Sequence, residues 1–99
     1  MKAKTKSAPR VQTPLRIGNA VFIRTITHYF TGRIVGLTKD EILLTDAAWI
    51  ACTARWATTL TTGELQEVEP YPNGMVVSVA RGAVTDACAW SHALPRAQK

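Results

Sequence analysis

The chain has 99 residues, of which 46% are hydrophobic and 19% charged, and its formal net charge is +5 at pH 7. This composition is typical of a globular protein with one domain and one modest core, and it excludes a disordered chain. No apolar run approaches the ~20 residues of a membrane span, and no apolar segment follows the basic N-terminus to form a secretion signal. We therefore expect a cytoplasmic protein that contacts no membrane.

Positive charge is concentrated in the first part of the chain. Residues 1–39 carry eight Lys and Arg residues and no acid, whereas residues 40–99 carry four Lys and Arg residues and seven acids. Such asymmetry favours a basic arm or face directed at an anionic partner. The alternative is that a lysine-rich tail merely keeps a small protein in solution.

The chain divides into an arm, a domain and a tail. Residues 1–14 are polar and basic, contain two prolines and show no apolar periodicity, so we expect a flexible basic arm. A single β-barrel domain is expected over residues 15–91. A loose C-terminal tail is expected over residues 92–99.

The densest run of β-branched and aliphatic residues lies between Val21 and Asp46. The strands that it predicts cover residues 20–27, 32–37 and 41–45. Gly32 and Gly36 fall inside or beside the second strand, where glycines usually mark a bulge or a sharp bend. The pattern therefore predicts a small, strongly bent β-domain.

Residues 46–62 differ in character, because alanine is frequent and apolar residues recur at helical spacings of three and four. Asp46 is suited to cap such a helix, and Gly63 is placed to end it. We expect one inserted α-helix here. Trp49 and Trp56 then share one helix face as packing anchors, and ligand stacking is the alternative.

The last part of the domain is predicted to be extended. The expected segments cover residues 64–69, 75–80 and 83–90. A strong turn signal at residues 72–74 and a break at Arg81-Gly82 separate them. The period-two pattern of residues 83–90 favours a strand, and a short Ala-rich helix is the alternative.

Catalytic and metal-binding signatures are absent from the sequence. The two histidines, His28 and His92, do not form a metal motif, and Cys52 and Cys88 lack both zinc spacing and a second pair. We expect a protein that is not an enzyme and uses no cofactor. The cysteines are interpreted as small core residues, with a bridge between them as the alternative.

Two blocks of the chain share a known pattern. In the first, Gly32-Arg33-Ile34 runs without a gap to Ile42-Leu43-Leu44, and in the second, residues 79–84 form an apolar–Arg81-Gly82–apolar turn. Together these blocks resemble the Sm-like small β-barrel family, most closely its bacterial Hfq branch. The resemblance implies a mainly β fold, a five-stranded, strongly bent SH3-like barrel here carrying the inserted helix. It also implies homo-oligomeric rings closed by edge-strand pairing, and RNA bound near the pore.

Carried over residue by residue, the resemblance places Thr38, Lys39 and Asp40 in one RNA-binding loop and Arg81-Gly82 in another. This sequence has Thr38 where the family has an aspartate, and Asp40 where the family has a base-stacking residue. An acid at that position would repel RNA. The link between the two blocks is also longer than in the family.

The residues themselves suggest a wider nucleic-acid surface, in which cations contact phosphates while aromatic rings stack bases. The predicted nucleic-acid-binding residues are Arg24, Tyr29, Phe30, Arg33, Lys39, Arg81 and Gly82. In the alternative interpretation, the aromatic rings cap the end of the barrel and the arginines are solvated.

The leading hypothesis from the sequence is a homo-oligomeric Sm-like protein that binds single-stranded RNA without catalysis. A second hypothesis is a structural or assembly protein, such as a ring or decoration component of the phage type, whose basic arm holds an acidic neighbour. A third is an oligomer that binds a small anionic, nucleotide-like ligand through Arg55 or Arg81 and a tryptophan.

Overall fold

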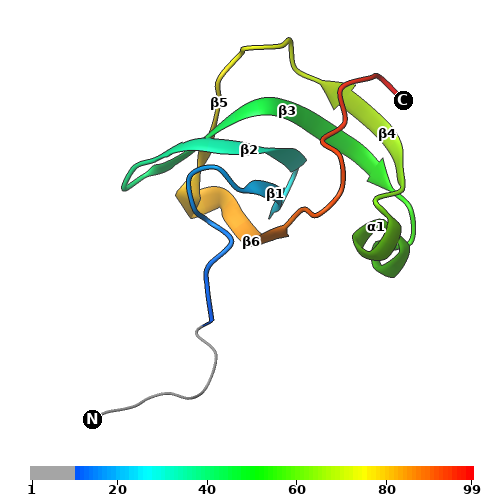
Figure 1. Cartoon of the computed structure of the whole chain (residues 1–99), viewed down its shortest axis with the longest axis horizontal. Coiled ribbons are helices and arrows are strands. Elements are labelled where there is room, and N and C mark those ends of the chain that lie inside the picture. Colours follow the sequence, from blue (N-terminus) through cyan, green and yellow to red (C-terminus); the bar gives the residue numbers. More distant parts are fainter. Residues whose placement is uncertain (1–10) are drawn as a thin grey trace.

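Six antiparallel strands and one short α-helix make up the computed structural model, which describes residues 11–99 (Figure 1). The strands are β1 (Ala20–Thr25), β2 (Tyr29–Leu37), β3 (Glu41–Thr53), β4 (Leu65–Pro70), β5 (Val77–Ala80) and β6 (Val84–Ala89). Helix α1 spans Trp56–Thr62, and a 3₁₀ turn, η2 (Arg81–Ala83), joins β5 to β6. The predicted mainly β class is confirmed, and the segment over residues 83–90 is a strand rather than a helix.

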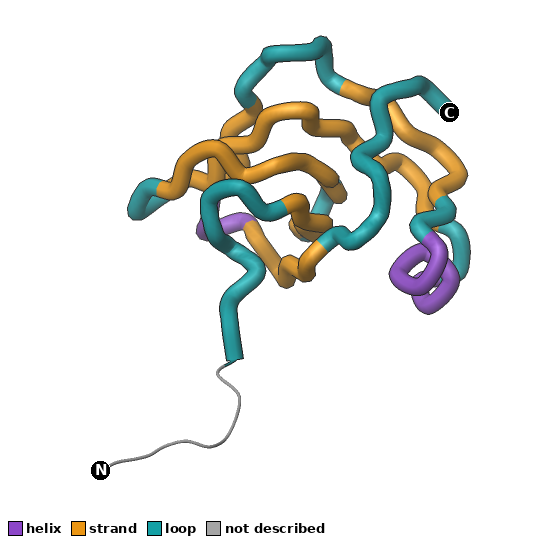
Figure 2. Tube along the Cα trace, viewed as in Figure 1, coloured by secondary structure: helices purple, strands orange, loops and turns teal. Residues whose placement is uncertain are grey.

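The strands form one curved sheet in the order β4-β3-β2-β1-β6, and β5 pairs with β3 as well. The first part of β3 pairs with β5 and the second part with β4, so one long strand supports both. The sheet curls strongly (Figure 2), but within residues 11–99 it is not closed, because β5 pairs only with β3 and β6 only with β1. It has six strands where the expected barrel has five.

The helix predicted over residues 46–62 is wrong over most of its length. Strand β3 continues to Thr53, and α1 begins only at Trp56. Pairing with β2 on one side and β4 on the other satisfies the backbone of this segment, and such tertiary pairing outweighs a helical spacing of apolar residues. Gly63 does end the helix as predicted: its φ is 81°, and its N–H donates to the carbonyl oxygen of Thr59 at 2.9 Å.

Asp46, predicted to cap that helix, instead lies at a β-bulge within β3. Its φ of 50° is in the left-handed region, which aspartate tolerates better than most residues. Thr31 of β2 faces Ala48, whereas Arg33 faces Thr45, so β3 carries one extra residue here. Even-numbered apolar side chains of β3 consequently face one side of the sheet before the bulge and the other side after it.

Bends in β2 occur at the two glycines where the sequence predicts them. The pairing of β2 with β3 shifts register around Gly32 and again at Gly36. A Cβ atom on Gly32 would lie 3.0 Å from Leu44 Cβ, and one on Gly36 would lie 3.0 Å from Leu43 Cδ1. Because these positions lack a side chain, β2 and β3 approach closely where the sheet curls.

Both faces of the sheet are covered, so the hydrophobic residues form two clusters. The first core cluster contains Val21, Ile23, Ile34, Ile42, Leu44, Ala47 and Val79. The second core cluster contains Phe22, Ala48, Ile50, Leu65, Val68 and Trp90. Trp56 of α1 and Leu94 of the C-terminal segment pack against the second cluster, which explains why β1 is buried on both of its faces.

The two ends of the chain differ in how much of them the structure describes. Most of the predicted basic arm, residues 1–14, lies outside the described residues. Residues 92–99, expected to be a loose tail, run from α1, where His92 Nε2 lies 2.8 Å from the carbonyl oxygen of Leu60, to β4. There the backbones of Lys99 and Val68 exchange hydrogen bonds of 2.9 and 3.0 Å (Figure 1). Among the described residues, no helix has the length and hydropathy needed to cross a membrane.

Candidate functional site

The two loops indicated by the Sm-like resemblance meet at one end of the sheet. The backbone N–H of Arg81 donates to the carbonyl oxygen of Asp40 at 2.9 Å, and the Arg81 guanidinium donates to that of Thr38 at 2.6 Å. Lys39 and Gly82 lie in the same two loops, and all five residues are exposed. We call these five residues the loop surface.

The turn between β2 and β3 is shaped by its own polar groups. Thr38 Oγ1 accepts hydrogen bonds from the backbone N–H groups of Asp40 at 3.3 Å and Glu41 at 2.9 Å. The Ser78 hydroxyl donates to the Glu41 carboxylate at 2.8 Å, which ties the turn to β5. Within residues 11–99, no acidic group pairs with the Lys39 ammonium, so its charge is available to an external anion.

Arg24, predicted to contact phosphate, is bound within the protein. It faces Asp86 across β1 and β6, its Nε donates to Asp86 Oδ1 at 2.8 Å, and its Nη2 donates to Asp86 Oδ2. Its guanidinium also lies over the Trp56 ring, 4.7 Å from the centroid. The hydrogen bonds with Asp86 raise the pKa of Arg24 and lower the pKa of Asp86. Arg24 therefore links β1, β6 and α1.

The two aromatic residues predicted to stack bases, Tyr29 and Phe30, pack on opposite faces of β2. Tyr29 packs against the second core cluster, with its ring centroid 5.9 Å from that of Phe22. Phe30 packs against the first core cluster, and its ring stacks on His28 with centroids 6.2 Å apart. Both are half-buried against these clusters.

Arg33 is exposed on β2, and its Nη1 donates to the carbonyl oxygen of Gly18 at 2.9 Å. Its contact is therefore with the segment that precedes β1 rather than with the loop surface. Of the seven predicted residues, three lie together: Lys39, Arg81 and Gly82. The other four lie away from the loop surface. Arg24 faces Tyr29 across β1 and β2, with its guanidinium 5.9 Å from the Tyr29 ring centroid, while it is paired with Asp86. Phe30 packs against the first core cluster, and Arg33 donates to Gly18.

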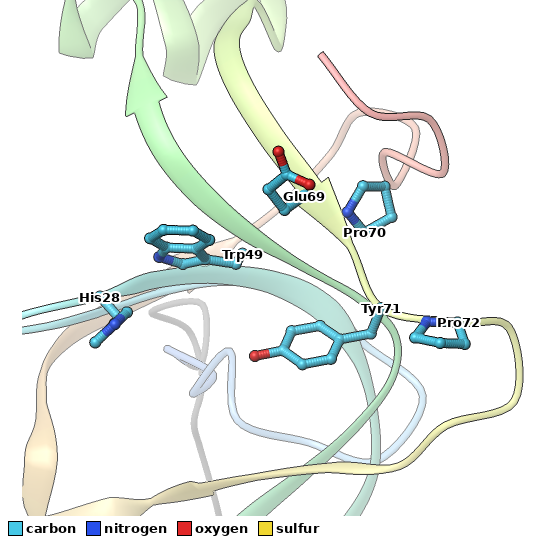
Figure 3. Close-up of a pocket in the computed structure, with 6 residues that line it drawn as sticks. All are labelled: His28, Trp49, Glu69, Pro70, Tyr71 and Pro72. Carbon is cyan, nitrogen blue, oxygen red and sulfur yellow. The ribbon is translucent and has the colours of Figure 1, made fainter.

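A pocket of about 350 Å³ opens at the other end of β2 (Figure 3). Its lining consists of His28, Trp49, Glu69, Pro70, Tyr71 and Pro72, which we call the aromatic pocket. Trp49 faces Glu69 across β3 and β4, so their side chains lie on the same side of the sheet. Trp49 is 37% exposed, and its ring centroid lies 5.7 Å from that of His28.

Sequence reasoning misses this pocket because it places Trp49 on a helix beside Trp56. In the structure Trp49 belongs to β3, and Trp56 packs edge-on against Phe22 with ring centroids 5.1 Å apart. The other sequence feature that contributes to the pocket is a tyrosine between two prolines, at residues 70–72, and by itself it indicates only the end of a strand.

Potential metal-ligating groups are scattered over the described residues. No three His, Cys, Asp or Glu residues within positions 11–99 come close enough together to hold a metal ion. Cys52 and Cys88 are free and half-buried, so the alternative of a bridge is not realised. Burial, reinforced by the Asp86 carboxylate, raises the pKa of Cys88 and favours its thiol form.

Comparisons with known proteins do not assign a family. No protein-family model, curated protein or solved structure matches this chain. The Sm-like resemblance thus stays a prediction, which rests on two sequence blocks and on the loops that they contribute to the loop surface.

Proposed function

We propose that this chain is a non-enzymatic, homo-oligomeric Sm-like protein that binds single-stranded RNA at the loop surface. The observation that carries the proposal is the meeting of Lys39 and Arg81, which are about forty residues apart in the chain and are brought together by the hydrogen bonds of Arg81 to Thr38 and Asp40. Two exposed cations, one in the β2–β3 turn and one in η2, are suited to contact phosphates.

The barrel is part of this proposal. The order β5-β3-β2-β1-β6, with a 3₁₀ turn joining its two ends, is compatible with five strands curling around the first core cluster. Helix α1 and strand β4 then form an insertion between β3 and β5. In such a barrel η2 would carry the chain across the seam between β5 and β6, which are not paired with each other, so their outer edges stay unpaired.

Oligomerisation is supported by the edges of the sheet. Among the described residues, β5 and β6 each have a single paired neighbour, so each has one edge that could pair with another copy of the chain. The outer edge of β4, in contrast, is occupied at Val68 by the backbone of Lys99. Met75 and Val76, which precede β5, are 46% and 57% exposed, and pairing at this edge would cover them.

A ring also offers a reason why the loop surface would bind RNA despite its acid. The loop surface of one copy carries two cations, Lys39 and Arg81, and one acid, Asp40, so a single loop surface attracts a polyanion only modestly. Repetition around a ring axis would place several loop surfaces along one strand of RNA. Binding at several sites raises the overall affinity without any new type of contact.

The test is binding of a fluorescently labelled, unstructured single-stranded RNA, followed by anisotropy over a range of salt concentrations. Affinity should fall as salt rises, because counterions are released from each neutralised phosphate. The double variant Lys39→Ala/Arg81→Ala should bind about tenfold more weakly and with a shallower salt dependence. Arg55→Ala, which removes an exposed cation elsewhere, is the matched control and should change affinity by less than about twofold.

Three results would contradict RNA binding at the loop surface. The first is undetectable binding at low salt, and the second is an affinity that does not change with salt. The third is an equal loss of affinity in Arg55→Ala and in the double variant, which would indicate general charge attraction in place of a site.

A structural assembly role is the second candidate, favoured by the free edges of β5 and β6 and by the internal engagement of Arg24. Val76→Lys should lower the native mass measured by light scattering, because a charge beside β5 opposes edge pairing. Val35→Lys is the control, since Val35 is 44% exposed on β2, which has neighbours on both sides. Assembly unchanged by Val76→Lys would exclude pairing at β5, and assembly without RNA binding would favour this role.

A further inference from the structure

The aromatic pocket combines rings with a carboxylate, and no lysine or arginine of the part of the chain that the structure describes lines it. Figure 3 shows the Trp49 and Tyr71 rings on two sides of the opening, with His28 at one end and Glu69 at the rim beside Pro70. We propose that this pocket binds the alkylammonium group of a lysine side chain, unmodified or methylated, presented by a partner peptide.

The chemistry of the lining favours a cation. The faces of aromatic rings carry negative electrostatic potential, and tryptophan attracts ammonium groups most strongly. Glu69 lies beside Trp49 through the pairing of β3 and β4, so a cation over the indole ring would also be near a carboxylate. Gln98 donates to Glu69 Oε2 at 3.1 Å, and Oε1 has no donor among the described residues.

The walls of the pocket are held in place before any ligand binds. The ring of His28 stacks on Phe30, which in turn packs against the first core cluster. The backbone N–H of Tyr71 donates to the carbonyl oxygen of Ala47 at 2.8 Å, and the neighbouring prolines restrict this segment further. Such preorganisation lowers the entropic cost of binding.

Arg96 fixes the outer part of the same loop. Its guanidinium donates to the carbonyl oxygens of Ala47 at 3.0 Å and Tyr71 at 2.6 Å, and to Asn73 Oδ1 at 2.8 Å. The Arg96 guanidinium is therefore engaged by backbone and amide oxygens of the loop after β4. Arg96 is a positioning residue for Tyr71, and the C-terminal segment becomes part of the pocket's support.

A peptide side chain fits this site better than the other candidate ligands. RNA bases also stack on aromatic rings, but Glu69 would repel the phosphates that accompany them. Small-molecule sites usually enclose most of the ligand surface, whereas this pocket is largely open to solvent. A lysine side chain needs only its alkyl stem and its terminal ammonium covered, because the peptide backbone stays outside.

The test is a titration of the full chain with short peptides, followed through the ¹⁵N-indole signals of its tryptophans by NMR. The peptides carry one lysine, one trimethyllysine, or the uncharged carbon isostere of trimethyllysine. A cationic peptide should shift the Trp49 signal and bind about tenfold more tightly than the isostere. Trp49→Ala should abolish binding, and Glu69→Gln should weaken it about threefold.

Glu67→Gln is the matched control, since Glu67 lies exposed on the same strand and outside the pocket lining. It should leave the affinity for the peptide unchanged. Trp49 is partly exposed, and the signals of Trp56 and Trp90 in Trp49→Ala report whether the fold is intact.

Four outcomes would overturn the proposal. Equal binding of the isostere would show a purely hydrophobic site. A Trp49 shift with tetramethylammonium chloride but with no cationic peptide would show a site for free amines. A Trp49 shift caused by single-stranded RNA would reassign the pocket to nucleic acid. A failure of every probe to shift Trp49 would exclude cation binding there.

Discussion

The two ends of β2 present opposite chemistry. At its C-terminal end, the loop surface exposes Lys39 and Arg81 on a turn shaped by backbone hydrogen bonds. At its N-terminal end, the aromatic pocket gathers Trp49, Tyr71 and Glu69, and no lysine or arginine among residues 11–99 lines it. One end is therefore suited to an anion and the other to a cation.

The two ends also differ in how they are built. The loop surface is made of two loops and needs one long-range contact, that of Arg81 with the turn before β3. The aromatic pocket draws on the β1–β2 turn, β3, β4 and the loop after β4, and its outer wall is held by Arg96. A surface made of two loops tolerates side-chain changes better than a pocket whose walls come from four segments.

The largest predicted effect concerns the end that carries the aromatic pocket. Phe30→Ala should lower the free energy of unfolding by about 2–3 kcal/mol, somewhat less than for a fully buried phenylalanine, because Phe30 is half-buried against the first core cluster. Urea denaturation measures this loss. Val35→Ala, at an exposed position of the same strand, should cost less than about 0.5 kcal/mol. A similarly small loss for Phe30→Ala would mean that its ring is free to stack bases.

The next effect concerns the bulge between the two halves of β3. Asp46→Val should lower the free energy of unfolding by roughly 1–2 kcal/mol, because a β-branched residue is strained at a φ of 50°. Asp46→Asn, which tolerates this conformation, should stay within about 0.5 kcal/mol of the unchanged protein in the same urea experiment. If Asp46→Val, Asp46→Asn and the unsubstituted protein were equally stable, residue 46 would not adopt a left-handed conformation in β3.

A smaller effect concerns the ion pair that occupies Arg24. Because its hydrogen bonds to Arg24 lower the pKa of Asp86 in the folded state, the carboxylate stabilises the fold above its usual pKa, and this contribution is lost as pH falls through the folded-state pKa. Asp86→Asn should cost about 0.2–1 kcal/mol at neutral pH, since both side chains are partly exposed. Thermal unfolding at pH 7 and in strong acid checks this.

In strong acid the difference between Asp86→Asn and the unchanged protein should vanish, because the carboxyl group is then protonated. Glu64→Gln, which removes an exposed acid outside the pair, serves as the control and should have little effect at either pH. A difference that persists in acid would show that packing, and not charge, accounts for the loss.

The smallest expected effect is the absence of communication between the two ends. Trp49→Ala should leave RNA affinity within about twofold, and Lys39→Ala/Arg81→Ala should do the same for the affinity of the lysine peptide, because distant sites without shared contacts are usually independent. Anisotropy and the NMR titration measure the two affinities. A loss in either crossed experiment would mean that the two ends act as one binding site.

Local pattern was sufficient to predict much of the β-structure. The alternation and β-branching around residues 20–45 predict β1, β2 and the start of β3, and Gly32 and Gly36 mark the bends. Gly63 correctly ends the helix, because a left-handed C-cap is a property of a single residue. These features depend on neighbours in the chain, and such neighbours are visible in a sequence.

The candidate site was predictable only where it was local. Lys39 and Arg81 lie in predicted turns, and the resemblance to the Sm-like family assigns both to binding loops; in the structure, Arg81 contacts the loop that contains Lys39. Arg24 was named as well, but its partner Asp86 is 62 residues away and its engagement depends on the pairing of β1 with β6. Whether a charged side chain is free to bind a ligand depends on residues far away in the chain, and the sequence alone does not show which of them it will contact.

Trp49 is the clearest case of a residue whose role depends on the assembled sheet. Its spacing from Trp56 favours a helix, yet hydrogen bonding from β2 and β4 makes this segment a strand and turns the two rings to different surroundings. Composition, turn residues and periodicity were enough to specify a bent β-domain with a basic first half. Strand pairing, acting between residues far apart in the chain, placed the aromatic pocket opposite the loop surface, because each pairing both satisfies backbone groups and sets which way the side chains point.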